Sequence, residues 1–330
     1  MAKVAVLDDW QGVARNSTDW SPLLARAEVV FFGQAFEGED DAAAKLADFD
    51  IVLSMRERTP LPASLINRLP KLRMIGITGS RNLSLDTAAC TAQGVLVCNT
   101  ADTTARASTA ELALGLLLSA ARAIPSANGN IRAGHFQEGL PVGISLAGKT
   151  IGIIGLGRLG THMANYCRAL NMTVLAWSEN LTAERAQAAG ATLVSKEILF
   201  SRSDAVSIHL VLSARSRGLI GASDIARMKP GAILVNTSRG PIVDEAALLE
   251  AVQSHRIIAA LDVYDREPLP ANHPLRNAPN TVLTPHLGYA VQDTWTEFYQ
   301  QSKENALAFL NGDPVRVMNP DALAIKSRGR

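Results

Sequence analysis

A chain of 330 residues is too long for one average core and can divide into two α/β units of ordinary size. Hydrophobic residues make up 47% of the chain and charged residues 19%, a balance that excludes a disordered protein. The net charge is +1 without a basic stripe or charge block, so we expect neither nucleic acid nor a membrane surface as a partner.

The N-terminal segment MAKVAVLDD lacks the apolar core of a signal peptide, and no apolar run reaches the length of a membrane span. We therefore expect a cytoplasmic protein. The three cysteines, Cys90, Cys98 and Cys167, are an odd number without C-x-x-C spacing. They predict buried thiols and neither a disulfide framework nor a metal site.

Short apolar runs, separated by longer segments that are mostly compatible with helix, form two series. The first series lies before Thr100 and comprises KVAVL, EVVFF, DIVLS, LRMIGI and VLVCN. The second begins at Thr150 and comprises TIGIIG, MTVLAW, ATLV, AVSIHL, AILVN, IIAALDV and TVLTPH. Because strands that alternate with helices form parallel sheets, the sequence predicts an α/β protein with two parallel sheets.

Two long helices are predicted around the second series. The segment Ser108–Ala123 opens with a capping Ser or Thr, and the segment Thr294–Leu310 is followed by Asn-Gly. The first of these helices is apolar on nearly all sides, which indicates packing against a second subunit as well as its own domain. A homodimer and a core helix within one chain explain this pattern about equally well.

The second series opens with a glycine pattern. Gly155, Gly157 and Gly160 form G-x-G-x-x-G between an apolar strand and a helix, as in dinucleotide-binding sites. The three glycines permit a tight turn, a close approach of pyrophosphate and close packing of helix on sheet, and the helix N-terminus adds N–H donors. The surrounding strand and helix favour a nucleotide site over a fortuitous glycine-rich turn.

The following strand ends at Trp177-Ser178-Glu179-Asn180, where an acidic residue usually binds the ribose hydroxyls of NAD. Ser178 stands at the expected position, so the carboxylate is missing or displaced to Glu179. No arginine follows at once to hold a 2′-phosphate, and the nearest cation, Arg185, is expected on the next helix and away from the ribose. NAD is the expected cofactor, and NADP stays open.

Three later segments each follow a strand and should meet at the carboxyl edge of the sheet. In NTSRG, Arg239 offers a planar fork for the carboxylate and carbonyl of a 2-oxo acid. In TPHLG, His286 can give a proton to an alkoxide or take one from a hydroxyl. In LDVYDREPLP, Glu267 would orient His286 and favour its protonated form.

The chain resembles the D-isomer-specific 2-hydroxyacid dehydrogenase family over essentially its whole length. The resemblance is carried by GLGRLG, NTSRGPIVDEAAL, LDVYDREPLP and TPHLGY. It implies an NAD(P)-dependent oxidoreductase that moves a hydride between a nicotinamide and C2 of a small D-2-hydroxy acid, with Arg239, Glu267 and His286 as catalytic residues. It does not name the acid or the physiological direction.

The resemblance implies further site residues. Besides the glycines and Ser178, the implied cofactor contacts are Arg158, Leu159, Thr237, Ser238 and Asp262, the last of them near the nicotinamide. The implied substrate contacts are Arg56, an extra anion contact in some members, and the loop residues Thr78, Gly79 and Ser80.

The resemblance also implies a discontinuous domain arrangement. Residues 1–101 and 290–330 would form a flavodoxin-like substrate domain, into which residues 102–289 insert as a Rossmann NAD(P)-binding domain. The alternative function is that of a nicotinamide-sensing co-repressor with the same fold, because fold does not settle function and such relatives can keep the same three residues.

Overall fold

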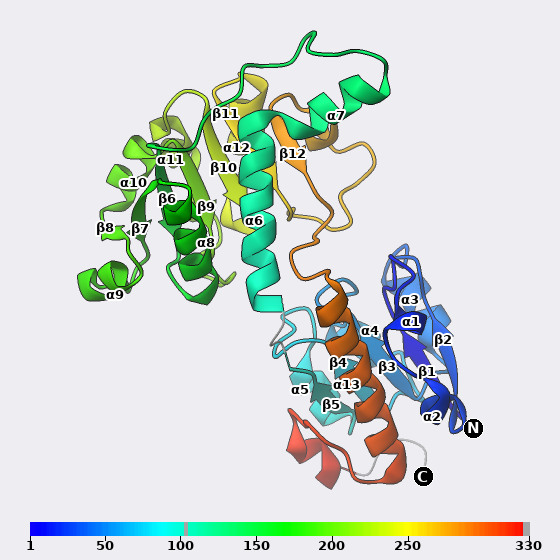
Figure 1. The fold of residues 1–330 in the computed structure, drawn as a ribbon. Helices are drawn as coiled ribbons and strands as arrows, with labels where there is room; N and C mark the ends of the chain where they lie inside the picture. The colour runs from blue at the N-terminus through cyan, green and yellow to red at the C-terminus, as the bar shows by residue number, and fades with distance from the viewer. Residues whose placement is uncertain (102–104, 326–330) are drawn as a thin grey trace. The chain divides into compact units, whose positions relative to one another are not determined.

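The structure is a computed structural model that describes residues 1–101 and 105–325. The chain divides into two compact units. One consists of Met1–Thr104 together with Val291–Arg330, and the other of Ala105–Ala290 (Figure 1). We call them the terminal unit and the central unit.

The terminal unit contains a five-stranded sheet in the order β2-β1-β3-β4-β5, and every pairing is parallel. Its strands are β1 (Ala2–Val6), β2 (Ala27–Phe31), β3 (Ile51–Ser54), β4 (Met74–Ile77) and β5 (Leu96–Asn99). Its helices are α1 (Ala14–Ser17), α2 (Ser21–Leu24), α3 (Glu39–Leu46), α4 (Ala63–Ile66), α5 (Thr87–Ala92), α13 (Gln292–Asn311) and the 3-10 helix η3 (Pro320–Ala324). The strand order confirms the predicted flavodoxin-like fold.

The two faces of this sheet are covered by different helices. One core joins α3, α4 and α5 to the sheet, with Leu46, Ile66 and Ile75 fully buried in it. The long helix α13 packs on β4 and on α1 and α2. As predicted, α13 stops at the Asn-Gly pair, where Gly312 adopts the left-handed conformation, φ 85°, that glycine favours at a helix end.

The central unit contains a seven-stranded parallel sheet in the order β12-β11-β10-β9-β6-β7-β8. Its strands are β6 (Thr150–Ile154), β7 (Thr173–Trp177), β8 (Thr192–Leu193), β9 (Ala205–Ile208), β10 (Ala232–Asn236), β11 (Ile257–Leu261) and β12 (Thr281–Leu283). Within this sheet, the chain begins at β6 in the middle and continues through β7 to β8 at one edge. It then returns to β9, which pairs with the other side of β6. This reversal is the switch point at which doubly wound sheets bind nucleotides.

Helices cover both faces of the central sheet. They are α6 (Ala105–Arg122), α7 (Ile124–Arg132), α8 (Arg158–Ala169), α9 (Ala183–Ala188), α10 (Lys196–Arg202), α11 (Ala222–Arg227), α12 (Glu245–Gln253) and the 3-10 helices η1 (Gly240–Ile242) and η2 (Pro274–Asn277). Side chains of α6, α8 and α9 share one core, and those of α10, α11 and α12 share the other. Successive residues of β10 alternate between them, since Leu234 belongs to one core and Val235 to the other.

The structure confirms the fold predicted from the sequence. Each apolar run that was predicted as a strand overlaps one of the strands β1–β12. The predicted helix Ser108–Ala123 is α6, and the three cysteines are buried free thiols. Among the described residues, no single helix is long and apolar enough to cross a membrane; the bent pair Ala107–Arg122 and Ile124–Arg132 passes by length and composition alone.

Candidate active site

The glycine loop of the central unit has the geometry of a phosphate cradle. Gly155 has φ 92°, and a Cβ there would lie 2.5 Å from the carbonyl oxygen of His209. A Cβ on Gly160 would lie 2.1 Å from the carbonyl oxygen of Gly155. A Cβ on Gly157 would meet nothing within 4 Å, so this backbone faces open space. Two glycines are therefore required for packing, and the third leaves room for a ligand at the start of α8.

The first turn of α8 lies at this cradle. Arg158 is exposed and Leu159 half-buried, where N–H groups at a helix N-terminus favour an anion. Thr237, after β10, adds a buried hydroxyl oxygen that has no hydrogen-bond partner among the described residues. An open backbone, a helix N-terminus and an unsatisfied hydroxyl fit a bound dinucleotide.

A pocket of about 350 Å³ lies at the carboxyl ends of β7 and β9. It is lined by Trp177, Ser178, Glu179, Asn180 and Arg185 on one side and by Leu210, Val211, Ser213, Arg215, Ser216 and Leu219 on the other. Ser178 thus lies where the sequence predicted an adenosine-binding position. Arg185 lies on α9, the helix after β7, and also lines this pocket. Arg215 reaches the pocket from a loop distant in sequence, which no pattern near Ser178 indicates.

The turn after β10 is fixed by its own polar groups. The Ser238 hydroxyl donates to the carbonyl oxygen of Ile208 at 2.7 Å, and the Ser238 N–H donates to Asn236 Oδ1 at 3.0 Å. The Asn236 amide in turn donates to the carbonyl oxygen of Arg239 at 3.0 Å. Ser238 therefore positions the turn that carries Arg239, while its contact with a cofactor stays a prediction.

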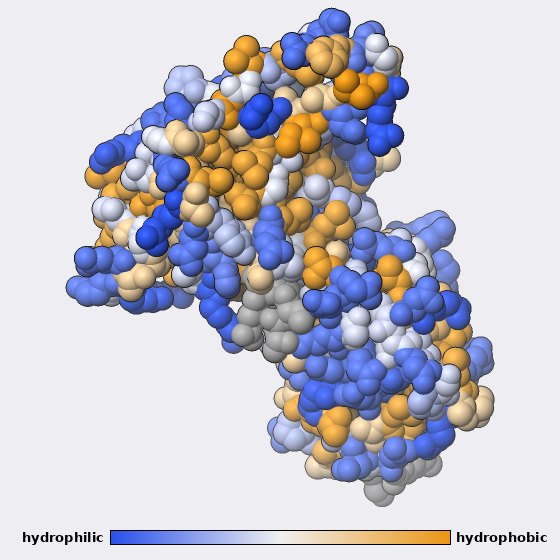
Figure 2. All heavy atoms as spheres, viewed as in Figure 1, coloured by the Kyte–Doolittle hydropathy of each residue, from blue (hydrophilic) through white to orange (hydrophobic). Residues whose placement is uncertain are grey.

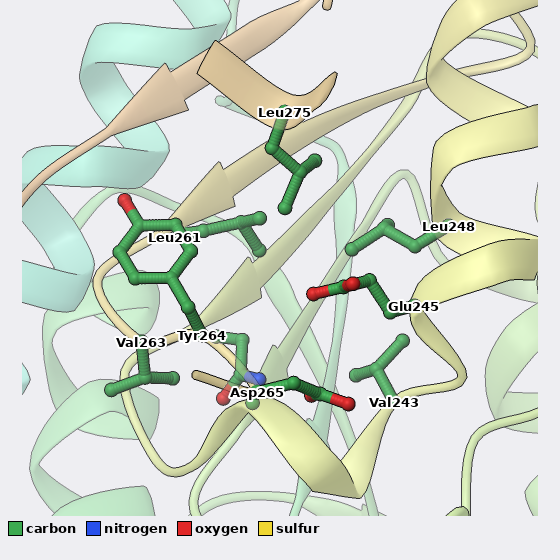
Figure 3. A pocket seen from close by; sticks show the side chains of 10 residues that line it. Val243, Glu245, Leu248, Leu261, Val263, Tyr264, Asp265 and Leu275 are labelled. Atoms are coloured by element: carbon green, nitrogen blue, oxygen red, sulfur yellow. The ribbon is translucent and has the colours of Figure 1, made fainter. Parts of the chain in front are cut away.

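The turn after β10 packs directly on the segment after β11. A Cβ on Gly240 would lie 2.1 Å from the backbone carbon of Tyr264, so only glycine fits. Beside this contact lies a cavity of about 10 Å³, whose side chains include Glu245, Asp265 and Leu275 (Figure 3). Because it has room for about one water molecule, it is not a substrate site.

Asp262, at the end of β11, holds the loop after β12. Its carboxylate accepts hydrogen bonds from the Thr284 hydroxyl at 2.6 Å, the Leu287 N–H at 2.7 Å and the Gly288 N–H at 2.9 Å. Asp262 is fully buried, and this burial raises its pKa above the ordinary aspartate value. The structure therefore gives this carboxylate a positioning role; its implied approach to a nicotinamide stays a prediction.

His286 and Glu267 form the closest pair in the site. His286 Nδ1 lies 2.5 Å from Glu267 Oε2, and Glu267 Oε1 accepts the Tyr264 N–H at 2.9 Å. His286 is held at φ 56°, and its own N–H donates to the carbonyl oxygen of Asp262 at 2.8 Å. Because a carboxylate only accepts hydrogen bonds, Nδ1 carries the proton of this bond. Nε2 is then the ring nitrogen that can exchange a proton with a substrate.

The charge state of Glu267 follows from its neighbours. Burial raises the pKa of Glu267, but the hydrogen bond and charge of His286, the Tyr264 N–H and the charge of Arg239 together lower it below the ordinary glutamate value. Arg239 itself is half-buried, and its Nη1 donates to the carbonyl oxygen of Ser238 at 2.7 Å. The three residues predicted from separate strand ends thus form one cluster at the carboxyl edge of the central sheet.

The predicted substrate contacts lie in the terminal unit. Thr78 is buried, and its hydroxyl accepts the Arg56 N–H at 2.8 Å. Gly79 is also buried, and its N–H donates to the Thr100 hydroxyl at 2.8 Å. Ser80 is exposed. Thr78 and Gly79 therefore brace the loop, and among these three residues Ser80 offers the accessible surface.

The central unit also matches a known family. The model of the D-isomer specific 2-hydroxyacid dehydrogenase NAD binding domain matches residues 114–288. The chain is 36% identical over 278 residues to a glyoxylate reductase from Aeropyrum pernix, covering 82% of this chain and 83% of that one. The chain belongs to the D-isomer specific 2-hydroxyacid dehydrogenase family.

Further relatives differ in how much of their own length this chain covers. A D-3-phosphoglycerate dehydrogenase from Archaeoglobus fulgidus is 38% identical over 263 residues, covering 79% of this chain and 50% of that protein. The chain thus spans about half the length of the curated D-3-phosphoglycerate dehydrogenases that it matches. The structure of phosphoglycerate oxidoreductase from Vibrio cholerae o395 superposes with a TM-score of 0.89 at 34% identity and covers 94% of this chain and 100% of that one.

Proposed function

We propose that this chain is an NAD(P)-dependent D-2-hydroxyacid dehydrogenase acting on a small 2-oxo or 2-hydroxy acid. The observation that carries the proposal is the His286–Glu267 pair, which lies beside Arg239 in the same unit as the glycine cradle. Discontinuous domains accord with this function: the central unit would bind the nucleotide, and the terminal unit would contribute to the substrate site.

The proton chemistry belongs to His286. In the direction of reduction, Nε2 of the imidazolium donates a proton to the C2 oxygen of the substrate, and in oxidation neutral Nε2 accepts it. The bound nicotinamide would supply or accept the hydride at C2. Glu267 keeps its charge because its pKa is lowered, and its carboxylate fixes the ring of His286 through Nδ1.

Substrate binding is assigned to Arg239, whose guanidinium can hold the carboxylate and carbonyl oxygens of a 2-oxo acid. In the terminal unit, Arg56 and the Ser80 end of the loop after β4 are proposed to meet the substrate carboxylate. Thr78 and Gly79 would support that loop from behind, since both are buried and hydrogen-bonded.

A homodimer is part of the proposal. Helix α7 and the segment after it expose Ile124, Ile131, Phe136 and Val142 by 50%, 59%, 67% and 96%. Hydrophobic residues lie on the visible surface of the central unit (Figure 2). Apolar groups of this size gain free energy when a second copy covers them. Phe136→Asp should therefore produce monomers in light scattering, whereas Leu83→Asp in the terminal unit should leave the mass unchanged; a dimeric Phe136→Asp variant would place the interface elsewhere.

The direct test of the proposed activity is a panel of 2-oxo acids assayed with NADH and with NADPH. Glyoxylate, hydroxypyruvate, pyruvate, phenylpyruvate and phosphohydroxypyruvate differ only beyond C2, so the panel also identifies the substrate class. Turnover of at least one acid is expected. Nucleotide binding without turnover of any acid would contradict the enzyme and support the co-repressor alternative.

A further inference from the structure

The pocket at the ends of β7 and β9 has two walls that carry arginines. We infer that this pocket binds the 2′-phosphate of NADP(H) through Arg215, so that the chain accepts NADP(H) as well as NAD(H). The inference rests on the proposed function, because it assumes that the glycine cradle binds a nicotinamide dinucleotide. It makes Arg215 a residue that determines cofactor specificity.

The loop after β9 holds Arg215 in a fixed turn. Ser216 is buried, and its hydroxyl donates to the carbonyl oxygen of Val211 at 2.7 Å and accepts the Ser213 N–H at 2.8 Å. The Arg217 N–H also donates to the carbonyl oxygen of Ser213, at 3.0 Å. These bonds close the turn so that Arg215 lines the pocket while Arg217 does not.

The opposite wall has a serine at the position where a carboxylate would reject a phosphate. Ser178 stands at the end of β7, and its short hydroxyl leaves room where a carboxylate would repel a 2′-phosphate. Glu179 is the acidic residue among those that line the pocket, and it is exposed. Arg185 contributes a second guanidinium from α9, so the lining carries two positive charges against one negative charge.

Neither guanidinium is already engaged by a carboxylate. Within the part of the chain that the structure describes, Arg185 and Arg215 form no ion pair, and their side chains form no hydrogen bond. A phosphate dianion matches the planar fork of arginine and forms charge-assisted hydrogen bonds with it. The expected preference for NAD, with NADP left open, rested on the residues next to Ser178, and Arg215 enters the pocket from a different loop.

The test compares two arginines of the same loop. Dissociation constants for NADH and NADPH are measured by titration calorimetry for wild type, Arg215→Ala and Arg217→Ala at one ionic strength. Wild type is expected to bind NADPH within about tenfold of NADH or more tightly. Arg215→Ala should weaken NADPH by about 10- to 100-fold, since a charged hydrogen bond is lost, and change NADH by less than about twofold. Arg217→Ala should change neither by more than about twofold.

Ionic strength and a conservative variant sharpen the test. NADPH affinity should fall more steeply with added salt than NADH affinity in wild type, and this difference should shrink in Arg215→Ala. Arg215→Lys should retain part of the NADPH affinity, because the charge is kept and the fork is lost.

Three results would overturn the inference. An equal loss of affinity for NADH and NADPH in Arg215→Ala would mean that Arg215 contacts the part that the two nucleotides share. A wild type that binds NADH more than about 100-fold more tightly than NADPH would exclude a phosphate site. In both cases the proposed activity would survive. Binding of neither nucleotide to wild type would instead contradict the proposed function together with the inference.

Discussion

Two carboxylates, the buried Asp8 and the half-buried Glu267, follow strands in the two units, and their surroundings shift their pKa values in opposite directions. Glu267, in the central unit, bonds to His286 and to the Tyr264 N–H, and its pKa is lowered. Asp8, after β1 in the terminal unit, accepts the Thr59 hydroxyl at 2.9 Å, while its Oδ2 has no partner among the described residues. Burial raises the pKa of Asp8 from 3.8 to about 6.

The difference shows that position at a strand end does not decide what a carboxylate does. Arg58 lies beside Asp8, but its Nη1 donates to the backbone carbonyl oxygen at 2.7 Å and its guanidinium stacks 4.4 Å from the Trp10 ring. For Asp8, desolvation outweighs the nearby positive charge, whereas for Glu267 the partnered imidazole outweighs desolvation. In the central unit, the charged form of Glu267 is stabilised by its partners. In the terminal unit, the charged form of Asp8 lowers the stability of the fold.

Removing the partner of Glu267 should have the largest effect. His286→Ala should reduce turnover by about 10²- to 10⁴-fold, because positioned proton transfer is lost. Cofactor affinity should stay near wild type, since the glycine cradle binds the nucleotide. Steady-state kinetics with the best 2-oxo acid and nucleotide titration measure both. His273→Ala, at the other histidine–glutamate pair of this unit, is the control and should remain active; a wild-type kcat in His286→Ala would refute the assignment.

Arg239→Lys should reduce kcat/KM by about 10²-fold, because an ammonium cannot reproduce a two-pronged contact with carboxylate and carbonyl. Because lysine keeps the positive charge, a fall in kcat/KM would be due to the lost two-pronged geometry of the contact. Arg227→Lys, on the exposed end of α11, is the matched control and should behave as wild type. Unchanged kinetics in Arg239→Lys would place this residue outside the substrate site.

Asp8→Asn should stabilise the terminal unit at pH 8 by up to about 3 kcal/mol, because the cost of a buried charge disappears. The folded pKa of Asp8 lies above the unfolded value, so the folded state binds more protons between pH 3.8 and about 6 and loses stability as pH rises through this window. The variant should therefore gain nothing below pH 3.8. Urea unfolding followed by tryptophan fluorescence tests this, since Trp10, Trp20 and Trp295 all lie in the terminal unit; a variant no more stable than wild type at pH 8 would contradict it.

Glu267→Gln should have the smallest effect, about tenfold at neutral pH. Glutamine keeps a hydrogen-bonding partner for His286 but removes the negative charge, and a neighbouring carboxylate favours a cationic partner. The pH profile of reduction should therefore move to lower pH. Glu245→Gln, which alters the pair with His273, should leave the profile in place; a stationary profile in Glu267→Gln would mean that Glu267 does not set the charge of His286.

The fold and the central cluster could be predicted because their signals are local. Each strand is a continuous apolar run, and parallel strands align their carboxyl ends, so Arg239, Glu267 and His286 could be expected to meet. Gly240 packs directly against the backbone of Tyr264, and this contact sets the spacing of two of these loops. The sequence shows only a glycine after a strand and does not predict the contact.

The rest depends on contacts between distant segments. Arg215 reaches the pocket because Ser216 closes its turn, and no pattern near Ser178 indicates this. The pKa of Asp8 is raised because the folded unit buries its carboxylate. The order of strands and helices in the sequence does not show how deeply a given side chain is buried. Asp262 was linked to the nicotinamide by resemblance, whereas the structure shows its carboxylate holding the loop of His286.

We propose that His286, Glu267 and Arg239 bind a 2-oxo acid and donate the proton while a reduced nicotinamide nucleotide supplies the hydride that converts it to the D-2-hydroxy acid. The most direct test is chiral analysis of the product formed from hydroxypyruvate or pyruvate, whichever the wild-type protein turns over, with the reduced nucleotide that it binds. We expect the D enantiomer alone, at a rate that His286→Ala lowers by at least about 10²-fold. Formation of the L enantiomer, or of the D enantiomer at an undiminished rate in His286→Ala, would contradict it.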